Sequence, residues 1–147
     1  MSDTSVILDD RAPALANYPH ARRAGGFIYV SGVSSRRHDG THEGVVIAED
    51  GTVTLDIREQ TRAVIENIGA ILRGAGADLS DIVDLTVLLV DMRDYAGMNE
   101  VYNRYFNAAT GPARTTCAVH QLPHPNLLIE IKAIAIDRGE VRSEDSV

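Results

Sequence analysis

The sequence predicts an α+β domain in which two helices pack on one face of a mixed β-sheet. Apolar residues recur at helical spacing in two segments, and several short runs rich in β-branched and aromatic residues surround them. The predicted elements follow the order β-β-α-β-α-β-β, which is typical of this class. We expect one domain over residues 1–137, followed by a polar C-terminal tail at 138–147 that lacks periodicity.

The first half of the chain contains two predicted strands and a helix. Residues 27–33 follow a glycine pair and are rich in strand formers, and residues 45–48 form a second short strand. Asp56, with Glu59 three residues later, is a typical helix start, and apolar residues then recur at helical spacing. Gly74 is the expected end of this helix.

The second half supplies the remaining elements. Residues 85–90 are continuously apolar, which suits a buried strand. Residues 94–107 have the pattern of a second helix, which Gly111-Pro112 ends. The last strands are expected at 115–120 and 128–136. Because two helices cover only one face of such a sheet, we expect a second copy of the chain to cover the other face.

Composition excludes several functional classes. The net charge is −7 and aromatic residues make up 5%, so we expect no nucleic-acid partner. No apolar run approaches the ~20 residues of a membrane helix, and the N-terminus does not resemble a signal peptide. We therefore expect a cytoplasmic protein without a membrane partner. Cys117 is the single cysteine, and its position within a strand predicts a buried structural thiol.

Two charged residues occupy positions suited to chemistry. Arg114 follows the rigid Gly111-Pro112 turn, where a guanidinium is either a bidentate carboxylate anchor or part of a surface salt bridge. Glu130 lies within an apolar strand and shares a face with Lys132 by two-residue alternation. Glu130 is either a cross-strand ion-pair partner or a partly buried carboxylate that exchanges protons near neutral pH.

Arginine and histidine also gather around residues 18–23 (Y-P-H-A-R-R), and more occur at positions 36–42 and in the loop before the last strand. Such a cluster on an acidic protein either concentrates an anionic substrate or is a solvated basic loop. The histidines lack metal-binding spacing, and we predict neither a metal nor a cofactor. No glycine-rich phosphate loop or hydrolase nucleophile motif is present.

Taken together and in order, several segments resemble the RidA/YjgF/UK114 family over residues 12–137. They are the strand F-I-Y-V-S-G, the helix end G-A-G-A-D-L-S-D-I-V, the run V-L-L-V-D-M-R-D-Y, the turn G-P-A-R-T-T and the final L-P-H-P-N-L-L-I-E-I-K-A-I-A-I. The resemblance implies a chorismate-mutase-like fold, a homotrimer with clefts at the subunit interfaces, and a metal- and cofactor-independent deaminase that hydrolyses imines, often after enamine tautomerisation.

The resemblance also implies roles for single residues. Arg114 would bind the substrate carboxylate, and Glu130 would position or activate the attacking water. The cleft would be lined by Tyr18, Ser31 and Gly32, and Asn99 matches a polar position at the start of the second helix. Many members have cysteine at the position of Thr116, so no role of that cysteine transfers to Cys117.

A narrower resemblance, carried by Y-P-H-A-R-R-A-G, V-S-G-V-S-S-R-R and A-V-H-Q-L-P-H-P, is to the 2-aminomuconate deaminase branch. It implies hydrolysis of 2-aminomuconate to 4-oxalocrotonate and ammonia in aromatic or kynurenine-type catabolism. A second carboxylate requires a second cation. The candidates are His20, Arg22, Arg23, Arg36 and Arg37, and His120 is a candidate for proton transfer.

Two other functions are compatible with the same residues. One is a general deaminase of 2-aminoacrylate-type enamines and imines, which shares the fold and core site and differs in the extra basic residues. The other is a non-catalytic trimer that binds a small ligand, a reading that the presence of both Arg114 and Glu130 disfavours.

Overall fold

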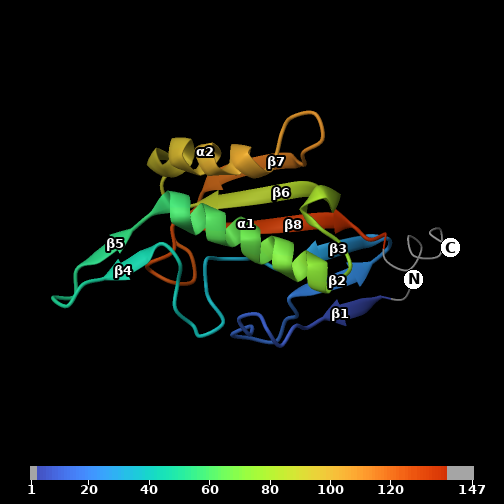
Figure 1. Cartoon of the computed structure of the whole chain (residues 1–147), viewed down its shortest axis with the longest axis horizontal. Coiled ribbons are helices and arrows are strands. Elements are labelled where there is room, and N and C mark those ends of the chain that lie inside the picture. The colour runs from blue at the N-terminus through green and yellow to red at the C-terminus, as the bar shows by residue number, and fades with distance from the viewer. Residues whose placement is uncertain (1–2, 139–147) are drawn as a thin grey trace.

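The protein forms a six-stranded sheet with helices on one face (Figure 1). The structure is a computed structural model, and it describes residues 3–138. Neighbouring strands are antiparallel except for the last pair, which is parallel. In spatial order the strands are β1 (Thr4–Val6), β2 (Ala21–Ala24), β3 (Phe27–Val30), β8 (Ile129–Ile136), β6 (Ile82–Leu89) and β7 (Ala113–Ala118). The predicted mixed sheet is thus confirmed.

Helix α1 (Ile57–Gly74) lies across the sheet, and helix α2 (Tyr95–Tyr105) lies beside it over β6 and β7 (Figure 1). The Asp56 side chain accepts hydrogen bonds from the backbone N–H groups of Arg58 and Glu59, which confirms the predicted N-cap. Short 3-10 turns at Leu79–Asp81 and Met92–Asp94 precede β6 and α2.

Three strands were not predicted. β1 and β2 extend the sheet beyond β3, and β5 (Val53–Leu55) pairs with β4 (Val45–Ile47) in a hairpin that projects away from the sheet (Figure 1). β2 consists of Ala-Arg-Arg-Ala, and its polar composition hides the strand in the sequence. Sheet pairing, not local propensity, determines its conformation.

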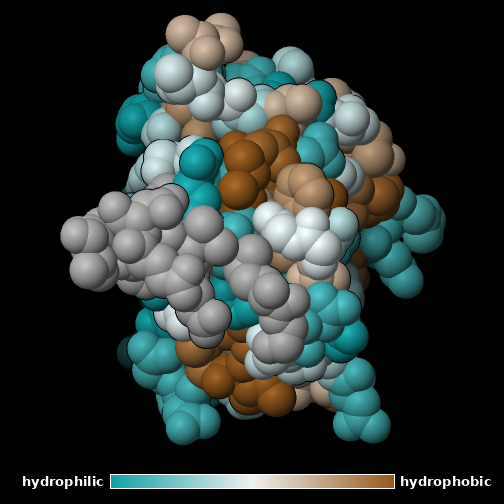
Figure 2. Space-filling view, turned by 90° about the vertical axis from the view of Figure 1, so that its right-hand side faces the viewer, coloured by the Kyte–Doolittle hydropathy of each residue, from teal (hydrophilic) through white to brown (hydrophobic). Residues whose placement is uncertain are grey.

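The core lies between the sheet and the helices. Side chains of β6 and β8 alternate, so that Leu85, Val87, Ile131 and Ala133 are buried beneath the helices. The alternate residues face the uncovered side of the sheet, where Tyr29 of β3 is 39% exposed. Figure 2 shows one end of the molecule, where apolar and hydrophilic patches lie side by side on the surface.

Cys117 corrects one prediction. Its thiol is exposed rather than buried, because β7 is an edge strand and Cys117 lies on the uncovered side of the sheet. The predicted tail lies outside the described residues except for Arg138, which forms an ion pair with Asp81 (3.1 Å). Within residues 3–138, no helix has the length and apolar content to cross a membrane.

Candidate active site

A cavity of about 830 Å³ lies where the segment after β3 meets the N-terminal segment, α1 and the loop before β8. Its size is that of a small-molecule site. Seven of the predicted site residues line it: Tyr18, His20, Ser31, Gly32, Arg36, Arg37 and Glu130. The structure therefore brings together residues that are far apart in the sequence.

Glu130 is half-buried in the wall of this cavity, on β8. Its carboxylate packs against Gly32, where an added Cβ would lie 2.8 Å from Oε2 of Glu130. Within the described part of the chain, the Glu130 carboxylate has no hydrogen-bond or ion-pair partner, so of the two alternatives the ion pair with Lys132 is absent. Lys132 donates instead to the Val30 carbonyl (3.1 Å). Burial raises the pKa of Glu130, which suits a group that exchanges protons.

His20 and Ser31 shape the cavity rather than offer free polar groups to it. Nδ1 of His20 accepts from the backbone N–H of Leu8 (3.1 Å), and Nε2 lies 2.8 Å from the Ala12 carbonyl oxygen. Ser31 donates its hydroxyl to the Pro19 carbonyl (2.7 Å). These bonds tie the N-terminal segment to the cavity rim. Tyr18, on the same segment, is 50% exposed.

Arg114 lies elsewhere, at the edge of the sheet under α2. Its guanidinium carbon is 4.6 Å from the ring centroid of Tyr102, and Nη2 donates to the Tyr95 hydroxyl (3.1 Å). Aromatic stacking of this kind orients an arginine while leaving its charge uncompensated. Among residues 3–138, Arg114 has no carboxylate partner, so its fork is available to an anion.

Arg114 and Glu130 point to opposite sides of the sheet. Arg114 pairs in register with Leu85, which is buried on the helix side. Glu130 pairs with Leu88 and alternates with the buried residues of β8, which places it on the other side. Asn99 on α2 and the exposed His120 also lie outside the cavity lining. One chain therefore does not unite all of the predicted residues.

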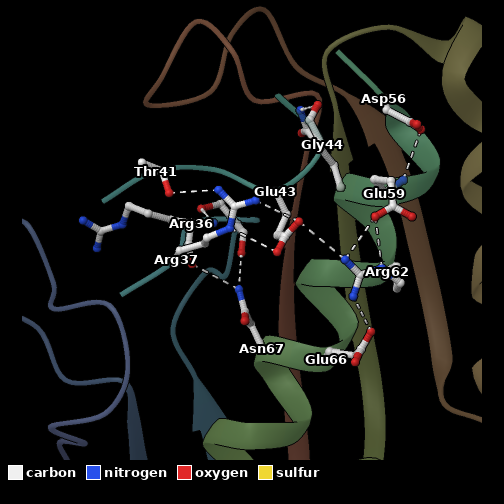
Figure 3. Close-up of polar contacts among 12 residues, drawn as sticks. Arg36, Arg37, Thr41, Glu43, Gly44, Asp56, Glu59, Arg62, Glu66 and Asn67 are labelled. Atoms are coloured by element: carbon white, nitrogen blue, oxygen red, sulfur yellow. Dashed lines mark hydrogen bonds and ion pairs between the residues drawn. The ribbon is translucent and has the colours of Figure 1, made fainter. Parts of the chain in front are cut away.

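The structure separates the basic residues into two kinds. Arg23 is bound to Asp137 (3.0 Å) and to the Ala75 carbonyl (2.5 Å), and Arg22 lies outside the cavity on β2. Arg37 forms an ion pair with Glu43 (3.0 Å) in the network of Figure 3. These contacts make Arg23 and Arg37 structural, while Arg36 remains without an ion pair among the described residues.

Sequence reasoning missed several side chains that complete these regions. Tyr95 and Tyr102 contact the guanidinium of Arg114. They are the first and eighth residues of α2, and nothing in the sequence indicates that they contact a residue of β7. His42 and His124 stack at 4.6 Å between ring centroids, although they come from separate loops. In the described part of the chain, no group of three or more His, Cys, Asp or Glu side chains is arranged to hold a metal ion.

The sequence matches a family model and is similar to several known proteins. The family model described as endoribonuclease L-PSP matches residues 9–137. A RutC family protein of Pyrococcus abyssi is 43% identical over 132 residues, which cover 88% of this chain and 94% of the relative. Reactive Intermediate Deaminase A of Arabidopsis thaliana, a chloroplastic protein, is 38% identical over 88% of this chain and 64% of its own length.

Among solved structures, the crystal structure of the yeast protein YEO7 superposes with a TM-score of 0.80 and 31% sequence identity. The match covers 93% of this chain and all of the yeast chain (100%).

Proposed function

The chain belongs to the RidA/YjgF family, and from this premise we propose that it is an enamine/imine deaminase acting on carboxylated substrates. The observation that carries the proposal is the contrast between two charged groups. Among residues 3–138, Glu130 is an unpaired carboxylate with a raised pKa in a cavity wall, and Arg114 is an oriented guanidinium without a carboxylate partner. One group is suited to move a proton and the other to hold an anion.

The two groups act together if the edge of one subunit lies against the cavity of another. In a single chain they occupy opposite faces of the sheet, two strands apart in the order β8-β6-β7. The uncovered sheet face carries apolar side chains such as Tyr29, which favours a further subunit on that side. We therefore propose a homotrimer in which Arg114 of one subunit completes the Glu130 cavity of its neighbour.

The proposed reaction follows from these positions. Arg114 holds the substrate carboxylate and so fixes the adjacent carbon. Protonation of the enamine at carbon gives the iminium form of the imine. Glu130 accepts a proton from water as the water oxygen bonds to the iminium carbon, and it passes this proton to nitrogen. Glu130 then accepts the hydroxyl proton of the tetrahedral intermediate as the carbonyl forms, the carbon–nitrogen bond breaks and ammonia leaves. The products are a ketone and ammonia. Positioning supplies much of the rate enhancement, and neither a metal nor a cofactor enters the scheme.

Within this class we propose 2-aminomuconate as the substrate, with 4-oxalocrotonate and ammonia as products formed in the cytoplasm. The support is Arg36, a cation in the cavity lining that forms no ion pair among residues 3–138, and the cavity volume of about 830 Å³, which has room for a dicarboxylate. The alternative substrate is 2-aminoacrylate, which carries a single carboxylate.

The direct test is ammonia release by purified, metal-free protein from freshly generated 2-aminomuconate and 2-aminoacrylate. We expect a higher kcat/KM for 2-aminomuconate. The reverse preference would identify a general imine deaminase, and inactivity on both would favour a ligand-binding protein. The ribonuclease named by the family model is tested separately by RNA binding at ~150 mM salt, where we expect none.

Subunit mixing tests the shared site. Arg114→Ala and Glu130→Gln should each be nearly inactive alone. When the two variants are unfolded together and refolded, mixed trimers contain a cavity with intact Arg114 and Glu130, and activity should partly return. If mixing restores nothing although mixed oligomers form, both residues belong to a site within one chain or to none.

A further inference from the structure

The arginines that line the cavity differ in whether their charge is neutralised. Four of the five form ion pairs with carboxylates, and Arg36 forms none among residues 3–138. The paired ones are Arg11 with Asp10, Arg37 with Glu43, Arg62 with Glu43, Glu59 and Glu66, and Arg73 with Asp78. An unpaired cation on a cavity wall is an available anion ligand.

Arg36 is held in place without being neutralised. Its Nη2 donates to the Pro13 carbonyl oxygen, and its guanidinium is directed away from the Arg37–Glu43–Arg62 network (Figure 3). A guanidinium has five N–H donors, so most remain free after this bond. The backbone of Arg36 forms an antiparallel bridge with His42, which places the two side chains next to each other.

His42 and His124 extend the hydrogen-bonding surface beside Arg36. Their rings stack at 4.6 Å, and both residues line the cavity. Nδ1 of His124 accepts from the Asn126 backbone N–H (3.1 Å), so its Nε2 carries the ring proton available to a ligand. Burial and the positive charges of His124, Arg36 and Arg37 lower the pKa of His42. A bound anion would offset the positive potential that Arg36 and Arg37 create beside His42.

A buried side chain fixes the two loops that carry the histidines. Gln60 of α1, fully buried, donates to the carbonyl oxygens of Asn126 (2.9 Å) and Gly44 (3.4 Å) and accepts from the Leu128 N–H (2.8 Å). Gly44 has a φ of +72°, and an added Cβ there would lie 2.6 Å from Gln60. The loops therefore meet at a defined position rather than by chance contact of mobile side chains.

A second observation at this place is a buried hydroxyl without a partner among residues 3–138. Ser35, adjacent to Arg36, is fully buried and lines the cavity. Its hydroxyl has no hydrogen-bond partner within the described residues. A buried hydroxyl without a partner costs free energy unless something else satisfies it.

We propose that Arg36, His42 and His124 form a second anion-binding subsite in this cavity, with the Ser35 hydroxyl as an additional donor. The subsite receives the second carboxylate of a dicarboxylate substrate, whose first carboxylate is bound by Arg114. The inference rests on the proposed function, because it takes Arg114 as the first anchor. It also selects Arg36 from the candidate cations, since Arg23 and Arg37 are already paired.

Equilibrium binding of two unreactive probes to the intact protein tests the subsite. Adipate carries two carboxylates, and hexanoate has the same chain with one. We expect adipate to bind about tenfold or more tightly than hexanoate, as a charge-assisted bond implies. Arg36→Gln should remove this advantage and leave the Kd of hexanoate within about twofold. An undiminished preference for adipate in Arg36→Gln would overturn the proposal.

Three controls separate the possible failures. Arg114→Gln should weaken both probes; if it weakens neither, the proposed first anchor is wrong, whatever Arg36 does. Arg22→Gln, an exposed arginine outside the cavity, should change neither probe. Inorganic phosphate supplies the third: if Arg36→Gln weakens phosphate but keeps the adipate preference, the subsite binds a free anion and not a substrate carboxylate.

A second pair of variants keeps the test valid if Arg36→Gln loses its fold, judged by circular dichroism. His42→Gln and His124→Gln leave the Arg36 tether intact and should each reduce the adipate advantage several-fold without changing hexanoate binding. If both histidine variants bind adipate as the unmodified protein does, the histidines are not part of the subsite.

Discussion

Glu130 and Arg114 are both half-buried charged residues, but the groups that surround their side chains differ. Glu130 lies against the bare backbone of Gly32, with no partner among the described residues, and burial raises its pKa. Arg114 is stacked on Tyr102 and hydrogen-bonded to Tyr95, groups that orient it without neutralising it. Most arginines of residues 3–138 form ion pairs with carboxylates, and Arg114 does not.

The difference corresponds to what each group has to do. A proton-transfer group benefits from an environment that destabilises its charged form, because its pKa then moves toward neutral pH. An anion anchor has to keep its charge at every working pH, and a guanidinium braced by aromatic rings does so. The surroundings of the two residues therefore match the roles proposed for them, which are proton transfer for Glu130 and anion binding for Arg114.

Removing the proton-transfer group should have the largest effect. Glu130→Gln keeps the size of the side chain but cannot accept a proton, so we expect kcat/KM to fall by about 10²–10⁴-fold with little change in substrate binding. Steady-state ammonia release measures the effect. Retention of more than about a tenth of the activity would assign proton transfer to another group.

The control is the pH dependence of kcat/KM, measured for the unmodified protein and for Glu130→Gln. Only ionised Glu130 accepts a proton, so kcat/KM should fall by about tenfold per pH unit as the pH drops through its pKa. Because burial raises this pKa, the acidic limb should lie above the ordinary range of a glutamate. The limb should be absent in Glu130→Gln; its persistence there would trace it to another group or to the substrate.

Displacing the carboxylate without removing it should have an intermediate effect. In Gly32→Ala the new Cβ would lie 2.8 Å from Oε2 of Glu130, so the carboxylate has to move. We expect kcat to fall by about 10–100-fold, since small displacements of a reacting group are costly, while thermal stability stays nearly unchanged. In a double-mutant cycle, Gly32→Ala should add little to Glu130→Gln. Full additivity would show that Gly32 acts independently of Glu130.

Loosening the arginine should have the smallest effect. Tyr95→Phe removes the hydroxyl that accepts from Nη2 of Arg114 and leaves the stacking on Tyr102 intact. We expect KM to rise by about two- to fivefold at nearly constant kcat. Tyr105→Phe is the matched control, because that hydroxyl contacts Glu66 instead. An equal effect of the two variants would mean that Tyr95 does not position Arg114.

Local signals explain what the sequence could predict. The N-cap at Asp56 lies within three residues of the groups it binds, and helix α1 was placed within a residue of its start. Two-residue alternation placed Glu130 on the same face of its strand as Lys132, and the burial pattern of β8 agrees. The roles of Arg114 and Glu130 came from the resemblance to a family, because spacing alone left an ordinary salt bridge as an alternative for each.

Contacts between distant segments explain what the sequence could not predict. Strand β2 has a polar sequence, and its Arg23 is paired with Asp137 at the other end of the chain. The contact between His42 and His124 depends on two loops meeting through Gln60. The burial of Cys117 was predicted wrongly because nothing in the sequence marks β7 as an edge strand.

The hydrogen bonds of Gln60 also bear on how this scaffold can change. One amide fastens both histidine-bearing loops to α1, whereas Glu130 is built into a strand of the sheet. Loop sequences can thus be exchanged as a cassette while Gln60 and the strand stay constant. Selection or engineering can then change which molecules bind in the cavity while the residue that transfers the proton stays in place. Such a modular arrangement suits the evolution of many specialised enzymes from one ancestor.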